Sequence, residues 1–207
     1  MYLTSNPASV LKTSTKLCPK NRDVIPNDVL IVIKSYLDKE NKHYLLACYM
    51  IHYLFVRPGE MCFLKIEDLS EDKRTLTLSG SHTKNGHDAV ITIPNHVIDL
   101  MRELEIFSAP PGYYIFSNDF RPGPERIKAI AFTRFWTSNV KKALNLSDVY
   151  KLYSLKDTGI TNMIKAKTDL LSVRDQARHS SVKVTNIYTP QECIEANAAL
   201  VGYEGVF

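Results

Sequence analysis

"YLLACYMIHYLFVRPGE", residues 44–60, contains the longest apolar run of the chain and ends at a proline and a glycine. The apolar part, residues 44–56, is shorter than the roughly 20 residues that cross a bilayer, and it includes His52. A segment that is apolar on all sides favours a helix buried in the middle of a domain. The sequence therefore predicts a central helix over residues 43–56, ending at Arg57, with a short helical turn opened by Glu60.

The segments on either side of this helix predict the rest of the architecture. Before it, apolar residues at 29, 30, 33 and 37 follow Pro26 and Asn27 and indicate an amphipathic helix. After it, "KIEDLS" (65–70), "RTLTLSG" (74–80) and "DAVITIP" (88–94) are typical of strands. The pair Asn85-Gly86 is a strong hairpin signal between the last two, and it places Lys84 at a turn. We expect a small three-stranded antiparallel sheet.

Helical spacing returns after Pro94. It predicts helices over residues 95–107, 128–145, 154–166, 172–180 and 191–201. Ser154, Ser172 and Ser180 are the expected N-caps of three of them. The predicted fold class is therefore mainly α with a small antiparallel sheet (α+β).

Composition gives weaker constraints. The chain has 207 residues, 44% hydrophobic, which suits one domain, and a formal charge of +4 that permits a polyanionic partner without requiring one. Its four cysteines form no CxxC pair and its six histidines lack metal-ligand spacing, so we expect a reducing compartment and no metal or other cofactor. The N-terminus does not resemble a secretory signal, and we take the protein as cytoplasmic, with no membrane partner. Residues 1–25 suggest a linker or arm, and residues 26–207 the main domain.

Five polar residues beside apolar stretches or turns are the candidate site: Arg57, Lys84, Lys156, His179 and Tyr188. Taken singly, each fits a structural role better. An arginine after a core helix usually caps it, a hairpin lysine is usually solvated, and an interior histidine or tyrosine usually packs. Only their combination favours chemistry.

Four segments carry a resemblance to a known family. They are "VRPGEMCFLKIEDL" (56–69), "SHTKNGHDAVITIP" (81–94), "YSLKDTGITNMI" (153–164) and "ARHSSVKVTNIYTP" (177–190). In this order they resemble the first arginine box, the hairpin lysine segment, the HxxR box and the closing histidine–tyrosine box of the tyrosine recombinases (phage integrases). The resemblance covers about residues 26 to 200 and implies the catalytic-domain fold of that family.

The resemblance also implies roles. Tyr188 is expected to attack a DNA phosphorus and form a 3'-phosphotyrosyl bond, which conserves the bond energy for rejoining. Arg57 offers a planar fork to two phosphate oxygens, and His179 donates to the same phosphate. Lys84 is expected to protonate the leaving 5' oxygen. Glu60, one turn after Arg57, is expected to orient it.

Two positions depart from the family pattern. The HxxR box has Tyr153 and Lys156 where the family usually has histidine and arginine. Lysine keeps the charge and loses the bidentate fork, and tyrosine cannot act as a base at neutral pH. Arg178, next to His179, is a candidate to compensate. We expect an active variant because the closing box is intact.

Double-stranded DNA is the implied partner, bound by a multimer that is a tetramer in the synapse, in a prokaryotic cytoplasm and in association with the nucleoid. Candidate DNA-binding residues, which a solvated helix face explains equally well, are Lys128, Arg134, Lys141, Lys142 and Arg178. We expect residues 1–25 to arrive from an N-terminal DNA-binding domain. The apolar tail, about residues 191–207, either docks on a neighbouring protomer or folds back on its own core.

Two alternatives stay open. A type IB topoisomerase shares the phosphotyrosine chemistry and relaxes supercoils without pairing sites. A DNA-binding module that kept the fold and lost cleavage is suggested by Tyr153 and Lys156. The target DNA sequence and the choice among integration, excision and inversion depend on base contacts that no motif reveals.

Overall fold

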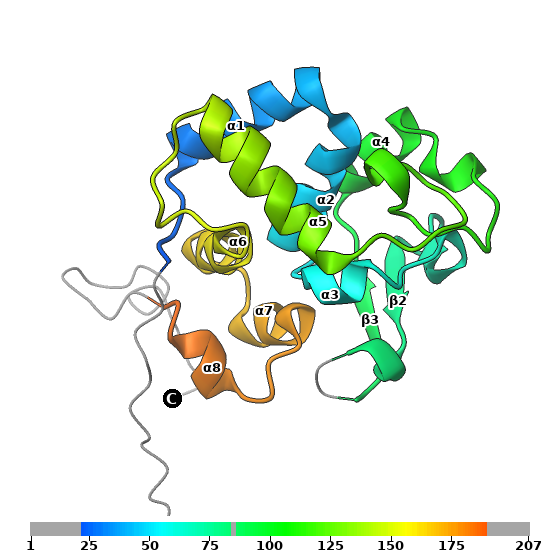
Figure 1. Cartoon of the computed structure of the whole chain (residues 1–207). Coiled ribbons are helices and arrows are strands. Elements are labelled where there is room, and N and C mark those ends of the chain that lie inside the picture. Colours follow the sequence, from blue (N-terminus) through cyan, green and yellow to red (C-terminus); the bar gives the residue numbers. More distant parts are fainter. Residues whose placement is uncertain (1–21, 84–85, 190–207) are drawn as a thin grey trace, which may run out of the picture.

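The apolar run forms the centre of the fold. In the computed structural model, helix α2 (Lys42–Tyr53) is buried along most of its length and contacts α1 (Asn27–Glu40), α4 (Asn95–Glu103) and α6 (Ser154–Lys165) (Figure 1). Helix α6 crosses α2 closely at Gly159, where an added Cβ would collide with the backbone carbonyl of His52. Glycine is therefore required at this crossing by packing.

The structure describes residues 22–83 and 86–189. The remaining helices in that part of the chain are α3 (Pro58–Met61), α5 (Ala129–Phe135), α7 (Leu170–Ala177) and α8 (Val182–Asn186), with the strands β1 (Leu69–Ser70), β2 (Thr75–Leu78) and β3 (Ala89–Thr92). Short 3-10 helices span Ile66–Asp68, Gly80–His82, Ile106–Ser108 and Asn118–Phe120. The predicted tail, the helix at 191–201 and most of the arm at 1–25 lie outside the described residues.

The central helix ends earlier than its apolar pattern predicts. It stops at Tyr53, and the fully buried Phe55 takes a left-handed conformation with φ 55°. Arg57 is then extended (φ −81°, ψ 146°) directly before Pro58. A proline disfavours helical geometry in the preceding residue, so the chain leaves the helix before it reaches Arg57.

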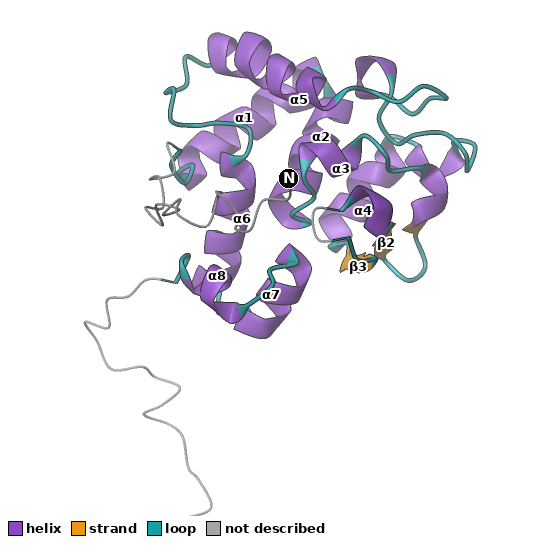
Figure 2. Ribbon diagram, turned by 60° about the horizontal axis from the view of Figure 1, so that its bottom comes forward, coloured by secondary structure: helices purple, strands orange, loops and turns teal. Residues whose placement is uncertain are grey.

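The predicted three-stranded antiparallel sheet is confirmed, with strand order β1-β2-β3 and Leu76 opposite Ile91. Strand β1 is only two residues long because the 3-10 helix Ile66–Asp68 takes the first half of the expected segment. The turn between β2 and β3 is longer than a tight hairpin, spanning residues 79–88 and containing the 3-10 helix Gly80–His82. Figure 2 shows this hairpin on the same side of the molecule as α7.

The helix expected over residues 128–145 is interrupted. Helix α5 passes into a π-helical turn, Trp136–Lys141, which places the buried Trp136 indole 2.9 Å from the Tyr150 carbonyl oxygen. The predicted serine caps also differ. Tyr153 precedes α6, Asp169 caps α7 by accepting from the Ser172 N–H, and Ser181 precedes α8. Within the described residues, every helix is too short or too polar to cross a bilayer.

Candidate active site

Arg57 and Glu60 form the first part of the site, at the start of α3. The Glu60 carboxylate accepts from the Arg57 backbone N–H at 2.9 Å and from its guanidinium at 2.6 Å. This is the cap expected from a glutamate in the first turn, and it holds the arginine side chain back over its own helix. The structure therefore shows the Arg57–Glu60 contact, and an orienting role of Glu60 stays a prediction.

Arg178 joins the same carboxylate from the other end of the site. It ends α7 in a left-handed conformation (φ 55°), and its guanidinium donates to Glu60 Oε2 at 2.8 Å and to the Phe55 carbonyl at 3.1 Å. Burial alone raises the pKa of Glu60, but the hydrogen bond and charge of Arg178, followed by the hydrogen bonds of Arg57, outweigh it and hold that pKa below its ordinary value. Glu60 is thus an anion that fixes two arginines.

These two arginines face a common cavity of about 210 Å³. His179 lines it beside them, and the β2–β3 hairpin closes it with Thr83, His87, Asp88 and Ala89. The His179 Nδ1 lies 2.9 Å from the Thr185 hydroxyl on α8, which fixes the imidazole orientation. Two guanidiniums and an imidazole around a small cavity form a site for an anion.

Tyr188 lies directly after α8, beside His179. The two rings are nearly parallel, 13° apart in orientation, with centroids 6.1 Å apart. The Tyr188 hydroxyl donates to Asp157 Oδ1 at 2.7 Å, and the Arg22 guanidinium binds the other oxygen of Asp157 at 2.5 Å. Burial, followed by Asp157, raises the pKa of Tyr188 well above its ordinary value. In this arrangement the phenol is held as a neutral donor.

Lys156 is placed differently from the other cations. Its side chain is buried on α6, with Nζ 2.7 Å from the Phe55 carbonyl and 3.5 Å from the Ala177 carbonyl. Burial, followed by the charges of Arg57 and Arg178, lowers the pKa of Lys156 to about 7. Lys156 does not line the cavity with the arginines.

Tyr153 lies near the guanidiniums of Arg57 and Arg22. Burial acts to lower the pKa of Arg57, and contacts with Glu60 and then Tyr153 outweigh it and raise that pKa. The Arg22 guanidinium stacks over the Tyr153 ring, 4.4 Å from its centroid. The phenol therefore contacts cations on two sides, which is compatible with a role as a hydrogen-bond donor.

Lys84 lies outside the described residues, and its neighbour Thr83 lines the cavity. Lys128, Arg134 and Lys142 are exposed on and around α5. Lys141 is buried and pairs with Asp148 at 2.6 Å, so it has a structural role that the sequence did not predict. Its contact with DNA stays a prediction.

Sequence reasoning missed Asp157 as the partner of Tyr188, and Arg178 as the second ligand of Glu60. A carboxylate three residues after an arginine is a local signal that can be read, whereas Arg178 and Glu60 are 118 residues apart. Asp157 lies next to Lys156 on α6, and no spacing in the sequence relates it to Tyr188.

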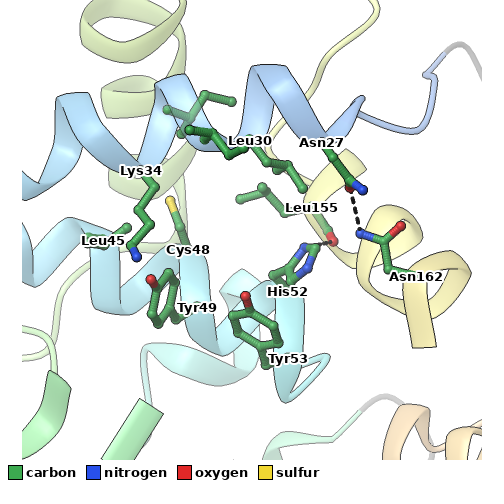
Figure 3. A pocket seen from close by; sticks show the side chains of 12 residues that line it. Asn27, Leu30, Lys34, Leu45, Cys48, Tyr49, His52, Tyr53, Leu155 and Asn162 are labelled. Atoms are coloured by element: carbon green, nitrogen blue, oxygen red, sulfur yellow. Dashed lines mark hydrogen bonds between the residues drawn. The ribbon is translucent and has the colours of Figure 1, made fainter. Parts of the chain in front are cut away.

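A larger cavity of about 420 Å³ lies elsewhere, between α1, α2 and α6 (Figure 3). Its lining is mainly apolar, with Leu30, Leu45 and Leu155 among its residues. His52 also lines it, and burial lowers the pKa of His52 to about 4, so that imidazole is neutral at physiological pH. We therefore place the chemistry at the smaller cavity.

Comparisons with known proteins identify the family of this chain. The model of the phage integrase family matches residues 25–193. Tyrosine recombinase XerA of Pyrococcus furiosus is 26% identical over 135 residues, 65% of this chain and 45% of that protein. A tyrosine recombinase of Thermosipho africanus is 22% identical over 175 residues, 82% of this chain and 59% of that protein. The chain thus spans about half the length of these curated relatives.

Solved structures share the fold. The Tn1549 transposon integrase in complex with circular intermediate DNA superposes with a TM-score of 0.69 at 15% identity, over 92% of this chain and 68% of that one. The match of the family model covers most of the described residues, including both arginines, His179 and Tyr188. This chain therefore belongs to the phage integrase family, the tyrosine recombinases.

Proposed function

We propose that this chain cleaves and rejoins DNA strands in site-specific recombination, without a metal ion, through a 3'-phosphotyrosyl bond at Tyr188. The observation that carries the proposal is the cavity where Arg57, Arg178 and His179 converge, with the Tyr188 ring alongside His179. Phosphoryl transfer to an enzyme needs charge stabilisation, which the cationic cavity supplies, and a nucleophile, for which Tyr188 is the candidate beside His179.

The residues of this chain can carry out each step of the proposed strand cleavage. The Tyr188 oxygen attacks the phosphorus, its proton leaves to solvent, and the bond from phosphorus to the 5' oxygen breaks. Arg57 and His179 donate to the non-bridging oxygens, on which charge builds up in the transition state. Lys84 gives a proton to the leaving 5' oxygen. The reverse sequence, with a 5'-hydroxyl of another strand as attacking group, rejoins the DNA.

Tyr188 must first leave Asp157. Its hydroxyl is bound to that carboxylate, and Tyr188 does not line the cavity in this structure. We infer that α8 shifts when DNA binds, because this five-residue helix leads into the segment that contains Tyr188. The cationic cavity then lowers the pKa of the phenol, which burial and Asp157 raise in the present arrangement.

Double-stranded DNA is the proposed substrate, and a tetramer on DNA the proposed assembly. Lys128, Arg134 and Lys142 are exposed on and around α5, which fits contacts with DNA phosphates. A solved integrase of the same fold was captured with circular intermediate DNA, which supports a DNA substrate for this chain.

Covalent trapping tests the proposal. The chain is incubated with a library of nicked duplexes whose cleaved fragment diffuses away, and covalent protein–DNA adducts are recovered under denaturing conditions and sequenced. We expect an enriched target sequence and complete loss of adduct in Tyr188→Phe, with Tyr36→Phe on α1 as the matched control. An adduct that persists in Tyr188→Phe refutes the assignment.

One alternative has a specific observation in its favour. The Tyr188–Asp157 hydrogen bond keeps the phenol neutral, as a DNA-binding module that has lost cleavage would. Duplex binding with no adduct at any pH supports that function. Supercoil relaxation by a monomer without sequence preference would instead indicate a type IB topoisomerase.

A further inference from the structure

Two cationic residues, Arg178 and Lys156, are candidates to act together with Arg57 on the phosphate. Arg178 ends α7, and Lys156 lies in the first turn of α6. Arg178 lines the 210 Å³ cavity together with Arg57 and His179. Lys156 is 2% exposed and does not line this cavity, and its Nζ donates to the carbonyls of Phe55 and Ala177. Arg178 also donates to the Phe55 carbonyl.

Glu60 holds the two arginines side by side. Its Oε1 accepts from the Arg57 guanidinium at 2.6 Å, and its Oε2 accepts from the Arg178 guanidinium at 2.8 Å. A guanidinium is a planar fork whose geometry matches the oxygens of a carboxylate or a phosphate. The Glu60 carboxylate therefore orients the guanidiniums of both Arg57 and Arg178, which line the same cavity. Two guanidiniums and one carboxylate together keep a net positive charge, which favours binding of an anion.

The backbone at Arg178 is strained. Its φ of 55° is a left-handed conformation at the end of α7, which glycine adopts more readily than other residues. Arg74, Glu105 and Lys167 share this conformation, so the backbone alone does not distinguish Arg178. Its contacts with Glu60 and the Phe55 carbonyl do.

We propose that Arg178, not Lys156, is the second cation on the DNA phosphate that Tyr188 attacks, and that Lys156 is a positioning residue. This inference rests on the proposed function. The fork of an arginine is thus present in the site, supplied by the segment before His179 instead of by α6. Lys156 occupies the place on α6 where the family usually has the second arginine, and it positions other residues instead of contacting the phosphate.

The contacts of Lys156 define that task. Phe55 lies two residues before Arg57, and Ala177 lies one residue before Arg178. One buried amine therefore binds the backbone segments that present both arginines. With its pKa lowered to about 7, mainly by burial, Lys156 carries only part of a charge at neutral pH, which suits a structural donor better than a transition-state cation.

Changing the charge of the phosphate distinguishes a cation that contacts the phosphate, as proposed for Arg178, from a residue that positions other side chains, as proposed for Lys156. In a methylphosphonate substrate, a neutral methyl group replaces one charged non-bridging oxygen at the cleavage site, which removes the charge that a catalytic cation stabilises. Single-turnover adduct formation is measured on the phosphodiester and on the methylphosphonate duplex, each relative to the unmodified chain. The variants are Arg178→Gly, which removes the side chain and the backbone strain together, Arg178→Lys, Lys156→Met and Lys156→Arg. The control is Arg174→Ala, whose side chain on α7 pairs with Asp175.

We expect Arg178→Gly to slow adduct formation on the phosphodiester by about 100- to 1,000-fold, and to lose less than about tenfold on the methylphosphonate. Arg178→Lys retains charge without the fork and falls between the unmodified chain and Arg178→Gly. Lys156→Met loses rate by the same factor on both substrates, because misplaced arginines are not repaired by changing the phosphate. Lys156→Arg gains nothing, because a larger guanidinium would replace a side chain that is already 2% exposed and bound to the carbonyls of Phe55 and Ala177.

The inference is overturned if Arg178→Gly loses the same factor on both substrates, or if methylphosphonate relieves Lys156→Met. It is also overturned if Lys156→Arg raises the rate on the phosphodiester. Should the unmodified chain form no adduct, the proposed function fails and duplex affinity still tests the contact. The slope of log affinity against log salt should fall by about 0.9 in Arg178→Gly and stay unchanged in Lys156→Met and Arg174→Ala. An unchanged slope in Arg178→Gly refutes the phosphate contact.

Discussion

Replacing Lys156 with methionine should change how the stability of the protein depends on pH. The ammonium of Lys156 is buried beside Arg57 and Arg178, and burial followed by these charges lowers its pKa to about 7. Glu60 and Asp157 act in the opposite direction with smaller effect. In the unfolded chain the same group has a pKa of about 10.4. Between these two values the unfolded state binds more protons than the folded state, so the free energy of unfolding rises with pH.

The size of this rise follows from the two pKa values. A fully developed difference of one proton changes the free energy of unfolding by about 1.4 kcal/mol per pH unit. Because the folded group is still half protonated near pH 7, the rise from Lys156 between about pH 6.5 and pH 8.5 is roughly 2 kcal/mol. Lys156→Met should remove this rise while the contributions of other groups remain.

Urea unfolding at a series of pH values measures the effect as the difference between the unmodified chain and the variant. Taking the difference cancels the titration of the cysteines, which both proteins share. Lys165→Met, an exposed lysine at the end of the same helix, is the matched control and should leave the pH dependence unchanged. Parallel curves for the unmodified chain and Lys156→Met would refute the reasoning, because Lys156 would then titrate alike in both states.

Three further substitutions test the packing and the site. Gly159→Ala should lower the free energy of unfolding by about 1–3 kcal/mol in urea titrations, because its Cβ has no room against the α2 backbone, while Gly112→Ala, with open space around its Cβ, should change it by less than about 0.5 kcal/mol. Glu60→Gln should slow adduct formation at least about tenfold in single-turnover assays by weakening the hold on both arginines; an unchanged rate contradicts this role. Asp157→Asn should speed adduct formation at neutral pH, since the pKa of Tyr188, raised by burial and then by Asp157, moves back toward its ordinary value; a slower reaction would show that Asp157 assists catalysis.

Local patterns in the sequence predicted a large part of the fold. The apolar run at 44–56 identified the central helix, and Pro58 identified its end to within a few residues. Alternating segments and Asn85-Gly86 predicted the three-stranded antiparallel sheet. The π-helical turn Trp136–Lys141 inside the predicted helix was not predicted, because one i→i+5 turn within an α-helix is too short to change the apolar spacing visibly.

The sequence by itself determined which residue types are present and which neighbours along the chain act together. Arg57 with Glu60 is such a pair, because residues three apart share one turn of helix. The spacing of His179 and Tyr188, with a short helix between them, is another.

Only the tertiary structure decided which cation faces the cavity. Arg178 reaches Glu60 across 118 residues, and Lys156 turns to the carbonyls of Phe55 and Ala177. Backbone carbonyls occur at every residue and leave no mark in the sequence, so a buried lysine that binds them cannot be distinguished by pattern from one that binds phosphate. The close crossing of α6 over α2 at Gly159 sets which side of α6 is buried, and with it the direction of the Lys156 side chain.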